Sequence, residues 1–309
     1  MSQNPLPRST NILIVGTGAL ATLFACRLAH AHYGITMLGT WQAGLSALSE
    51  NGARLVDIHG NEQAITVRAT DDPHECRGTK YALVLVKSWQ TERAARQLAT
   101  CLAGDGLAIT LQNGLGNREI LVRKLGADRV ALGSTTTGAT LLGPGLVRPG
   151  GEGIVSIESH PAITPLQKVL SAAGFAVDVV NDAGSLLWGK LIINAAINPL
   201  TALLGIPNGK LLERSSAREL MSALAREVAD VAAAERIRLP FSDPVKAAED
   251  VAHKTAANHS SMFQDIRRGA PTEIDAICGA VVRAGKKHNL PTPANWACWH
   301  LVKAMVHAE

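Results

Sequence analysis

The hydrophobic pattern of the first 180 residues is that of a parallel sheet. From Asn11 onward, short β-branched runs alternate with stretches of helical periodicity, and the runs are apolar at nearly every position. Strands that are apolar on both faces and alternate with helices are typical of a parallel sheet covered by helices on both sides. The pattern predicts a doubly wound α/β domain with strands at residues 12–15, 35–38, 81–86, 107–111 and 130–134.

The rest of the pattern divides the chain. Residues 54–58 and 63–67 flank the turn His59-Gly60-Asn61-Glu62 and predict an inserted hairpin. Gly and Pro are dense between residues 136 and 157, which predicts closing antiparallel strands. After Asp182 the strand signals vanish and helical segments rich in Ala, Leu and Glu follow. We expect a disordered extension over residues 1–10, an α/β domain over 11–181 and a mainly α-helical domain over 182–309, with a cleft between the two domains.

A polar stripe interrupts the most apolar part of the helical domain. Lys190, Asn194 and Asn198 are spaced four residues apart within segment 188–204, so they share one face of a helix. A buried ammonium or amide is costly unless it has polar partners. Either protein groups satisfy the amides while Lys190 reaches water, or a ligand faces all three. Three polar groups in register leave these two interpretations evenly weighted.

Composition and charge narrow the class of protein. Hydrophobic residues make up 47% and charged residues 18%, as in ordinary globular enzymes. Aromatic residues are only 4% and the net charge is +4, so neither a nucleic-acid surface nor an anionic-membrane surface is indicated. The start of the chain lacks the apolar core of a signal peptide and no uninterrupted apolar run would span a membrane, so we expect a cytoplasmic protein. The five cysteines form no C-x-x-C pair and predict reduced thiols with no metal site.

A glycine-rich loop follows the first predicted strand. Gly16-Thr17-Gly18-Ala19-Leu20-Ala21 fits the pattern G-x-G-x-x-G/A and opens a helical stretch. In this pattern the first Gly makes a tight turn, the second lets the backbone approach a pyrophosphate, and the small last residue packs the helix on the strand. The pyrophosphate lies on free N–H groups at the positive end of the helix. The loop therefore predicts a Rossmann-like, dinucleotide-binding first domain.

The ends of later strands add candidate cofactor contacts. An acid after the second strand normally binds the ribose 2′-OH of NAD and a base binds the 2′-phosphate of NADP. Here the segment Met37-Leu-Gly-Thr-Trp-Gln42 has neither, and Thr40 could hydrogen-bond either form. Lys87 and Asn113 each follow a strand, where ligands of open parallel sheets bind, although each taken singly is more typical of a solvated strand end or a turn.

An acid lies near the start of a C-terminal helical run. Glu273 belongs to Thr272-Glu-Ile-Asp275, ahead of helical residues 276–287, with Thr272 as candidate N-cap. Acids are common in first turns because they complement the helix dipole, so this position alone does not indicate chemistry. Upstream, segment 258–265 offers an amide and hydroxyls that could hold a carboxylate or cap a helix.

Together these motifs resemble the ketopantoate reductase family, the 2-dehydropantoate 2-reductases, over essentially the whole chain after the first ten residues. In the first domain the resemblance is carried by Gly16-Thr-Gly-Ala-Leu-Ala21, Val86-Lys-Ser-Trp-Gln90, Gln112-Asn-Gly-Leu-Gly116 and Gly133-Ser-Thr-Thr136. In the second domain it is carried by Trp188-Gly-Lys-Leu-Ile-Ile-Asn194, Asn198-Pro-Leu-Thr-Ala202, Pro207-Asn-Gly209, Ser260-Ser-Met-Phe-Gln-Asp-Ile266 and Thr272-Glu-Ile-Asp275.

The resemblance implies an NADPH-dependent reduction of a small 2-keto acid, ketopantoate, to pantoate on the way to pantothenate and coenzyme A. By matching position, Lys190 is implied as the proton donor and Glu273 as a catalytic residue between cofactor and substrate. Cofactor contacts are implied for the loop from Gly16 to Ala21 and for Thr40, Lys87, Asn113, Ala139 and Glu273. Substrate contacts are implied for Lys190, Asn194, Asn198, Asn208, Asn258 and Ser261. The sequence leaves a homodimer open.

The chemistry of a lysine acid agrees with this implied role. Hydride addition to a carbonyl carbon puts negative charge on the oxygen, and a positioned ammonium can stabilise that charge and deliver a proton. An unperturbed Lys has a pKa of about 10.4, and desolvation would lower this value toward neutrality.

One residue departs from the family pattern. Thr40 stands where family members commonly have an Arg that binds the 2′-phosphate, so NADH is the alternative cofactor, unless Arg93 or another base reaches across. Three alternatives to the implied function remain: a paralogue that reduces another small 2-keto acid, a relative such as a 3-hydroxyacid or glycerol-phosphate dehydrogenase, and a nicotinamide-binding sensor without turnover. Loss of Lys190 or Glu273 would mark a sensor, and both residues are present.

Overall fold

The computed structural model describes residues 11–306, so the extension predicted for residues 1–10 lies outside the described residues. The chain divides into two compact units. The second unit holds the chain from Gly184 onward together with two short segments, Lys87–Trp89 and Asn113–Gly116, and the first unit holds the remainder. Each short segment begins three residues after the last residue of a strand of the first unit, β6 (Thr79–Val84) or β7 (Leu102–Thr110).

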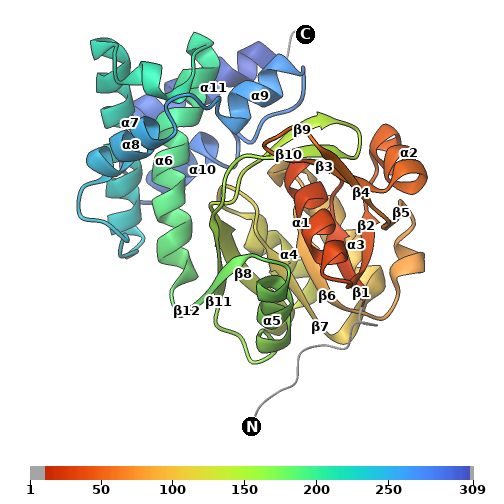
Figure 1. Cartoon of the computed structure of the whole chain (residues 1–309). Helices are drawn as coiled ribbons and strands as arrows, with labels where there is room; N and C mark the ends of the chain where they lie inside the picture. Colours follow the sequence, from red (N-terminus) through yellow and green to blue (C-terminus); the bar gives the residue numbers. More distant parts are fainter. Residues whose placement is uncertain (1–10, 307–309) are drawn as a thin grey trace. The chain divides into compact units, whose positions relative to one another are not determined.

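The first unit is built on an eight-stranded sheet (Figure 1). Its strand order is β12, β11, β8, β7, β6, β1, β2, β5. All neighbouring strands pair in parallel except β8 and β11, which pair antiparallel. The strands are β1 (Asn11–Val15), β2 (Gly34–Leu38), β5 (Arg68–Thr70), β6 (Thr79–Val84), β7 (Leu102–Thr110), β8 (Val130–Thr135), β11 (Ile154–Glu158) and β12 (Ala176–Val180).

Helices cover both faces of this sheet, as the near-continuous apolar strands predict. In β1, Ile12 and Ile14 belong to one buried cluster with Phe24 of α1, whereas Leu13 and Val15 belong to another that includes residues of α3 and α4. This alternation is the two-residue period of a strand buried on both sides. The helices are α1 (Ala19–His30), α2 (Gln42–Asn51), α3 (Thr91–Cys101), α4 (Asn117–Leu125) and α5 (Thr164–Ala172). The doubly wound parallel fold is confirmed.

A second, four-stranded sheet contains the predicted hairpin. Strands β3 (Ala53–Val56) and β4 (Glu62–Ile65) pair antiparallel, and β9 (Ala139–Gly143) pairs antiparallel with β10 (Leu146–Pro149). The two hairpins join because β10 pairs in parallel with β3. Strand β5, which the sequence analysis does not predict, follows the first hairpin and forms the edge of the main sheet beside β2.

Within the described residues the second unit is helical, as predicted. Its longest helix, α6, is long and apolar enough to span a membrane by composition, yet 72% of its most apolar window is buried inside the protein. It is therefore a core helix, and it continues through Pro199 without a break. The elements are α6 (Ala183–Leu204), η4 (Asn208–Leu211), α7 (Ser215–Ala234), α8 (Pro244–Lys254), α9 (Ser261–Arg267), α10 (Cys278–Lys287) and α11 (Pro293–Val306).

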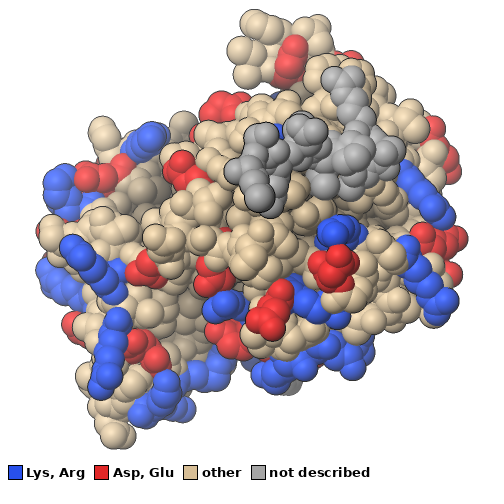
Figure 2. Space-filling view, turned by 90° about the horizontal axis from the view of Figure 1, so that it is seen from below, with Lys and Arg blue, Asp and Glu red and all other residues tan. Residues whose placement is uncertain are grey.

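Basic side chains on the surface have acidic neighbours. Figure 2 shows Lys and Arg side chains interspersed with Asp and Glu over one face of the molecule. Exposed ion pairs include Lys246 with Asp250 at 2.9 Å and Arg218 with Glu249 at 2.6 Å. Exposed pairs of this kind contribute little to stability because water and salt screen them.

Candidate active site

The glycine-rich loop of the first unit has a backbone conformation that requires glycine. Gly16 has a φ of +132°, and a Cβ there would lie 3.0 Å from the carbonyl oxygen of Leu85. The N–H of Gly16 donates to the carbonyl of Leu38, at the end of β2, over 2.8 Å. The loop therefore turns tightly between the ends of β6 and β2, where a residue with a side chain would be strained.

The start of α1 is open for an anion. Gly18 is exposed, and a Cβ added there would meet no atom within 4 Å. As the N-cap of α1, Gly18 has no side chain to bond the first N–H groups, and no acid lies in the first turn. Ala21 is fully buried against the sheet. The N–H groups and helix dipole at this end suit a pyrophosphate, so the residues present fit a dinucleotide.

Two other predicted cofactor residues also belong to the first unit. Thr40 follows β2 and is exposed. The glycine-rich loop lies against the end of this strand, as shown by Gly39, where an added Cβ would lie 2.7 Å from the Thr17 side chain. Ala139 begins β9, is partly buried and pairs with Pro149. These contacts place Thr40 beside the glycine-rich loop and leave the role of Ala139 a prediction.

In the second unit, Glu273 is the centre of a polar cluster. Its side chain is almost fully buried, with a residue exposure of 5%. One carboxylate oxygen accepts from the backbone N–H of Ser88 at 3.0 Å, and the other accepts from the Asn113 side-chain amide at 3.1 Å. The Lys87 ammonium lies 3.8 Å from the latter oxygen. Glu273 thus joins two of the predicted cofactor contacts, although it is 185 residues from Ser88 in sequence.

Glycine lets these segments meet. Gly114, with a φ of +80°, lies against the backbone of Ala276, where a Cβ would clash. The next residue, Leu115, donates its N–H to the Ala276 carbonyl at 2.9 Å. The chain therefore bends at residues 113–116, and this bend presents Asn113 to Glu273.

A partly buried ion pair adjoins Glu273. The Lys87 ammonium donates to a carboxylate oxygen of Asp265 at 2.6 Å, and Arg268 lies 3.5 Å from the other oxygen of Asp265. The Asp265 side chain is 6% exposed and that of Lys87 is 36% exposed. Burial raises the pKa of Asp265, whereas the two nearby carboxylates raise the pKa of Lys87 despite its desolvation. Lys87 therefore stays charged between two carboxylates.

The pKa of Lys190, in the second unit, is strongly lowered by its surroundings. It lies on α6 and is partly buried. Desolvation lowers the pKa of Lys190 from 10.5 to about 8, and the negative charge of Glu273 partly opposes this shift. Lys190 is therefore within electrostatic reach of the cluster and is far more acidic than an ordinary lysine.

The amides of the polar stripe follow Lys190 along α6. Asn194 is partly buried and Asn198 is 7% exposed. One turn beyond Asn198, the hydroxyl of Thr201 contacts the carbonyl of Asn198 at 3.0 Å and the hydroxyl of Ser260 at 2.7 Å. Ser260 is also the N-cap of α9, accepting from the N–H of Phe263. Ser260 thus docks α9 on α6 and leaves Ser261, the next residue, exposed.

Asn208 and Asn258 are brought together through the backbone. The N–H of Asn208 donates to the carbonyl of Asn258 at 2.9 Å, and the Asn208 side-chain NH₂ donates to the Thr255 hydroxyl at 2.9 Å. The Asn208 side-chain oxygen is buried and lacks a partner among the described residues, whereas Asn258 is exposed. An orphaned acceptor of this kind is costly unless something else donates to it.

The structure corrects the local environment expected for Glu273. Helix α10 begins at Cys278 with Ile277 as its N-cap, so Thr272 does not cap it. The Thr272 hydroxyl instead accepts from the N–H of Ile274 in a preceding turn. Glu273 therefore lies outside the helix and does not serve its dipole, because a run of turns intervenes between the acid and the first helical residue.

Sequence reasoning did not assign a role to Ser88 or Asp265. Both lie inside quoted motifs, but Ser88 acts through its backbone N–H, which any residue except proline supplies. Asp265 pairs with Lys87 across 178 residues, a contact that no local pattern encodes. The only signal for Asp265 in the sequence was that it is an acid within a segment whose other residues are typical of the start of a helix.

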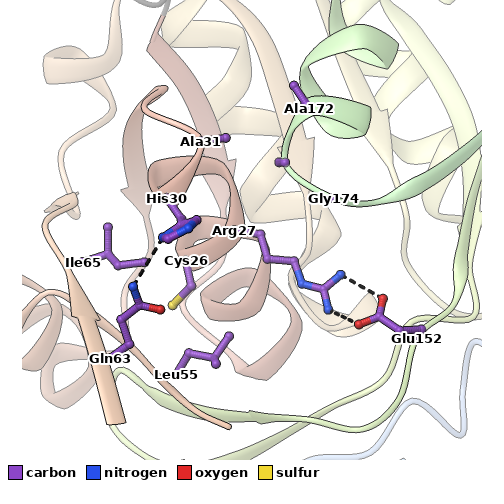
Figure 3. Close-up of a pocket in the computed structure, with 11 residues that line it drawn as sticks. Cys26, Arg27, His30, Ala31, Leu55, Gln63, Ile65, Glu152, Ala172 and Gly174 are labelled. Carbon is purple, nitrogen blue, oxygen red and sulfur yellow. Dashed lines mark hydrogen bonds and ion pairs between the residues drawn. The ribbon is translucent and has the colours of Figure 1, made fainter. Parts of the chain in front are cut away.

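A cavity elsewhere in the first unit is distinct from these residues. It has a volume of about 560 Å³ and surrounds the C-terminal end of α1, the end opposite the glycine-rich loop. Figure 3 shows its polar groups already paired: Arg27 bonds Glu152, with a closest distance of 2.6 Å, and Gln63 donates to His30 at 3.3 Å. Burial raises the pKa of Cys26 to about 12, so its thiol is unreactive. No predicted site residue lines this cavity.

The cysteines are free and buried, as predicted. Burial also raises the pKa of Cys101 to about 12 and that of Cys298 to about 11. Across residues 11–306, no group of three or more His, Cys, Asp or Glu side chains is arranged to hold a metal ion.

Comparison with known proteins gives one consistent result. A family model described as "Ketopantoate reductase PanE/ApbA" matches residues 12–162, and one described as "Ketopantoate reductase PanE/ApbA C terminal" matches residues 182–306. The chain is 33% identical over 287 residues to the 2-dehydropantoate 2-reductase of Halobacterium salinarum, covering 91% of this chain and 94% of that protein.

Two solved structures are similar over nearly their whole length. A PanE/ApbA family ketopantoate reductase from Ralstonia eutropha JMP134 has a TM-score of 0.90 at 31% identity, with 96% of this chain and 98% of that chain covered. A D-mandelate dehydrogenase with NADH and anilino(oxo)acetate has a TM-score of 0.90 at 25% identity, with the same coverage.

Proposed function

The chain belongs to the ketopantoate reductase family, and we propose that it reduces the keto group of ketopantoate, 2-dehydropantoate, to give pantoate for pantothenate and coenzyme A synthesis. As its relatives indicate, it is a nicotinamide-dependent oxidoreductase with a small keto acid as substrate. One observation carries the residue-level proposal: Lys190, with a pKa lowered to about 8, is coupled electrostatically to a buried Glu273.

Lys190 is the proposed proton donor. With a pKa of about 8 it is mostly protonated at neutral pH, yet it releases its proton more readily than an ordinary lysine. Its ammonium also stabilises the negative charge that develops on the substrate oxygen before the proton is delivered. An ordinary lysine would supply the charge but would be a weaker acid.

Glu273 keeps Lys190 in its protonated form. Its negative charge raises the pKa of Lys190 against the effect of desolvation. Two donors, the Ser88 N–H and the Asn113 amide, hold the carboxylate in place. Lys87, which pairs with Asp265, lies 3.8 Å from the Glu273 carboxylate and adds a positive charge beside it.

The amides and hydroxyl near Lys190 are the proposed substrate contacts. Asn194 and Asn198 lie one and two turns after Lys190 on α6, so their amides extend from the proton donor along one helix face. A 2-keto acid that carries a hydroxyl group, as ketopantoate does, needs both donors and acceptors, which amides supply together. Ser261 and Asn258 are exposed, and the Asn208 side-chain oxygen has no partner within residues 11–306, so these groups have capacity to bind.

The glycine-rich loop is the proposed pyrophosphate site of the cofactor. When bound, the reduced nicotinamide dinucleotide supplies the hydride. NADPH is the family standard. Gly16 and Gly18 let the backbone approach the pyrophosphate, and the first N–H groups of α1 bind it. Thr40, Lys87, Asn113 and Ala139 complete the proposed contacts.

The setting is proposed to be the cytoplasm. Five free, buried cysteines suit a reducing compartment, and α6, which is apolar enough to cross a membrane, is part of the protein core. Apart from the nicotinamide cofactor, the proposed reaction requires one small 2-keto acid as its substrate.

A panel of 2-keto acids tests the substrate. Ketopantoate, pyruvate and phenylglyoxylate are each incubated with NADPH and with NADH, and loss of reduced-nicotinamide absorbance is followed. We expect ketopantoate to have the highest kcat/KM with at least one cofactor. No turnover of ketopantoate beside brisk turnover of another acid would refute the proposal.

The second candidate is a paralogous reductase of another 2-keto acid. It is favoured by the structural similarity to D-mandelate dehydrogenase, whose name indicates an aromatic 2-hydroxy acid, at a TM-score of 0.90. Preferential turnover of phenylglyoxylate in the panel would select this candidate. A sensor without turnover is disfavoured because Lys190 and Glu273 are both present and electrostatically coupled.

A further inference from the structure

We propose that Asp71, held by Gln42 beside Thr40, makes this protein bind NADH in preference to NADPH. The inference rests on the proposed function only in that the glycine-rich loop binds a nicotinamide dinucleotide. It departs from the family standard, and the reason lies in residues that strand β5 brings next to the end of β2.

The adenosine ribose of a bound dinucleotide would lie beside the end of β2. In Rossmann-like domains the ribose 2′ position is read by residues just after the second strand, next to the glycine-rich loop. Here that strand is β2. Gly16 bonds its last residue, Leu38, at 2.8 Å, and the Thr17 side chain packs against Gly39. Residues from Thr40 onward therefore occupy the position that reads the 2′ group.

The sequence around β2 offers no Lys or Arg for a 2′-phosphate. From Leu28 to Ala53 the chain contains no Lys or Arg. The residues after β2 are Thr40, Trp41 and Gln42, all neutral. A 2′-phosphate carries nearly two negative charges at neutral pH and is normally bound by Arg or Lys. Nothing in this segment offers such a partner.

An acid reaches the end of β2 from the neighbouring strand, β5. Strand β5 runs parallel to β2 with Thr70 opposite Leu38, and the Gly39 N–H donates to the Thr70 carbonyl at 3.1 Å. Asp71, the next residue, therefore emerges beside Thr40. The side-chain amide of Gln42 donates to one Asp71 carboxylate oxygen at 3.0 Å and holds it there.

One carboxylate oxygen of Asp71 is available to accept a hydrogen bond from a ligand. Its second oxygen has no hydrogen bond to any residue in the described part of the chain. Its neighbour Asp72 is engaged differently, because it accepts from the His74 N–H at 2.8 Å and caps the turn Pro73–Cys76. Arg68, the nearest cation along β5, is paired with Glu75 at 2.8 Å.

These steps give a physical basis for selectivity. An unengaged carboxylate oxygen can accept from the ribose 2′-OH, as the acid after the second strand does in NAD-binding domains. The same charge repels a 2′-phosphate, because like charges placed close together disfavour binding. Because Asp71 is exposed, salt screens the repulsion, and the preference should narrow as ionic strength rises.

Binding measured without a keto acid tests this directly. Dissociation constants for NADH and NADPH are obtained by titration calorimetry of the full chain. We expect NADH to bind at least about tenfold more tightly than NADPH. Asp71→Asn should reduce this ratio to about threefold or less, chiefly by strengthening NADPH binding. Thr40→Arg, which adds a cation and leaves Asp71 in place, should also strengthen NADPH binding.

The control is Asp72→Asn, which removes the neighbouring charge but not the one held by Gln42, and which should leave most of the ratio intact. Equal or tighter binding of NADPH by the unaltered chain would overturn the proposal, as would binding of neither cofactor. A ratio unchanged in both Asp71→Asn and Thr40→Arg would also overturn it. Should NADPH bind more tightly and lose affinity in Arg93→Ala, then Arg93 reads the 2′-phosphate instead.

The outcomes separate this inference from the proposed function. A chain that binds NADH tightly but reduces no keto acid would refute the proposed reaction and leave the selectivity of Asp71 standing. A chain that reduces ketopantoate efficiently with NADPH and binds NADH weakly would do the reverse.

Discussion

The glycine-rich loop and the polar cluster around Glu273 are built in opposite ways. The loop is six consecutive residues, and it presents backbone N–H groups from the start of one helix. The cluster is made chiefly of side chains, contributed by segments as far as 185 residues apart, and it depends on buried charges. The loop therefore tolerates few added atoms, whereas the cluster tolerates few changes of charge.

The difference determines what mutations should do in each region. In the loop, any side chain on a glycine blocks the approach of a ligand or strains the turn. In the cluster, a change that preserves shape but removes a charge alters the pKa of Lys190 or leaves a partner unpaired. The following variants test this contrast, from the largest expected effect to the smallest.

Lys190→Ala should lower kcat for ketopantoate reduction by about 10²–10⁴-fold, the usual contribution of a positioned acid or base. The substitution removes the proposed proton donor. Steady-state rates at pH 7 measure the effect, and calorimetric binding of the cofactor is the control, which should change little. Turnover within a few-fold of the unaltered chain would exclude Lys190 as the proton donor.

Gly18→Ala and Gly16→Ala should separate binding from folding in the loop. A Cβ on Gly18 meets no protein atom, so Gly18→Ala should weaken cofactor binding about tenfold or more while the Tm stays the same. At Gly16 the backbone is left-handed and a Cβ meets Leu85, so Gly16→Ala should also cost about 1–3 kcal/mol of stability. Equal thermal stability of the two variants would contradict this distinction.

Glu273→Gln should lower kcat about tenfold, because the amide has one oxygen where two donors need an acceptor. It also removes the negative charge that raises the pKa of Lys190, so that pKa should fall further below about 8. The alkaline limb of the kcat/KM profile should consequently move to lower pH. A limb that stays in place would show that Glu273 does not act on the proton donor.

Asp265→Asn tests the partly buried ion pair with Lys87 against a surface pair. Replacing Asp265 weakens the charged hydrogen bond to Lys87 and should cost about 1.5–3 kcal/mol of unfolding free energy. The matched control is Asp250→Asn, which breaks the exposed pair with Lys246 and should leave the denaturation midpoint unchanged. Urea unfolding of both variants measures the difference, and equal losses would refute it.

Much of the first unit could be predicted from sequence because its signals are local. Apolar runs mark strands β1, β2, β6, β7 and β8, and the loop from Gly16 to Ala21 is contiguous. Strand β5 was missed because it is three residues long and pairs with β2 through contacts that sequence does not reveal. Asp71 directly follows this strand, so the residue proposed to set cofactor selectivity was missed with it.

The polar cluster was only half predictable. The spacing of Lys190, Asn194 and Asn198 showed a polar helix face, but the partners of that face come from elsewhere in the chain. The contacts of Glu273 with Ser88 and Asn113 depend on tertiary packing, and the acid looked like an ordinary first-turn residue. Resemblance to a known family, not local pattern, singled out Glu273, and the structure shows what holds it.

The pH dependence of kcat/KM for ketopantoate tests the role of Lys190 most directly. The proton donor must be protonated, so activity should be level below the Lys190 pKa of about 8 and fall about tenfold per pH unit above it. In Lys190→Arg the guanidinium stays charged throughout, so a residual, lower activity should show no limb near pH 8. An alkaline limb that persists unchanged in Lys190→Arg would assign the titration to another group and contradict the account.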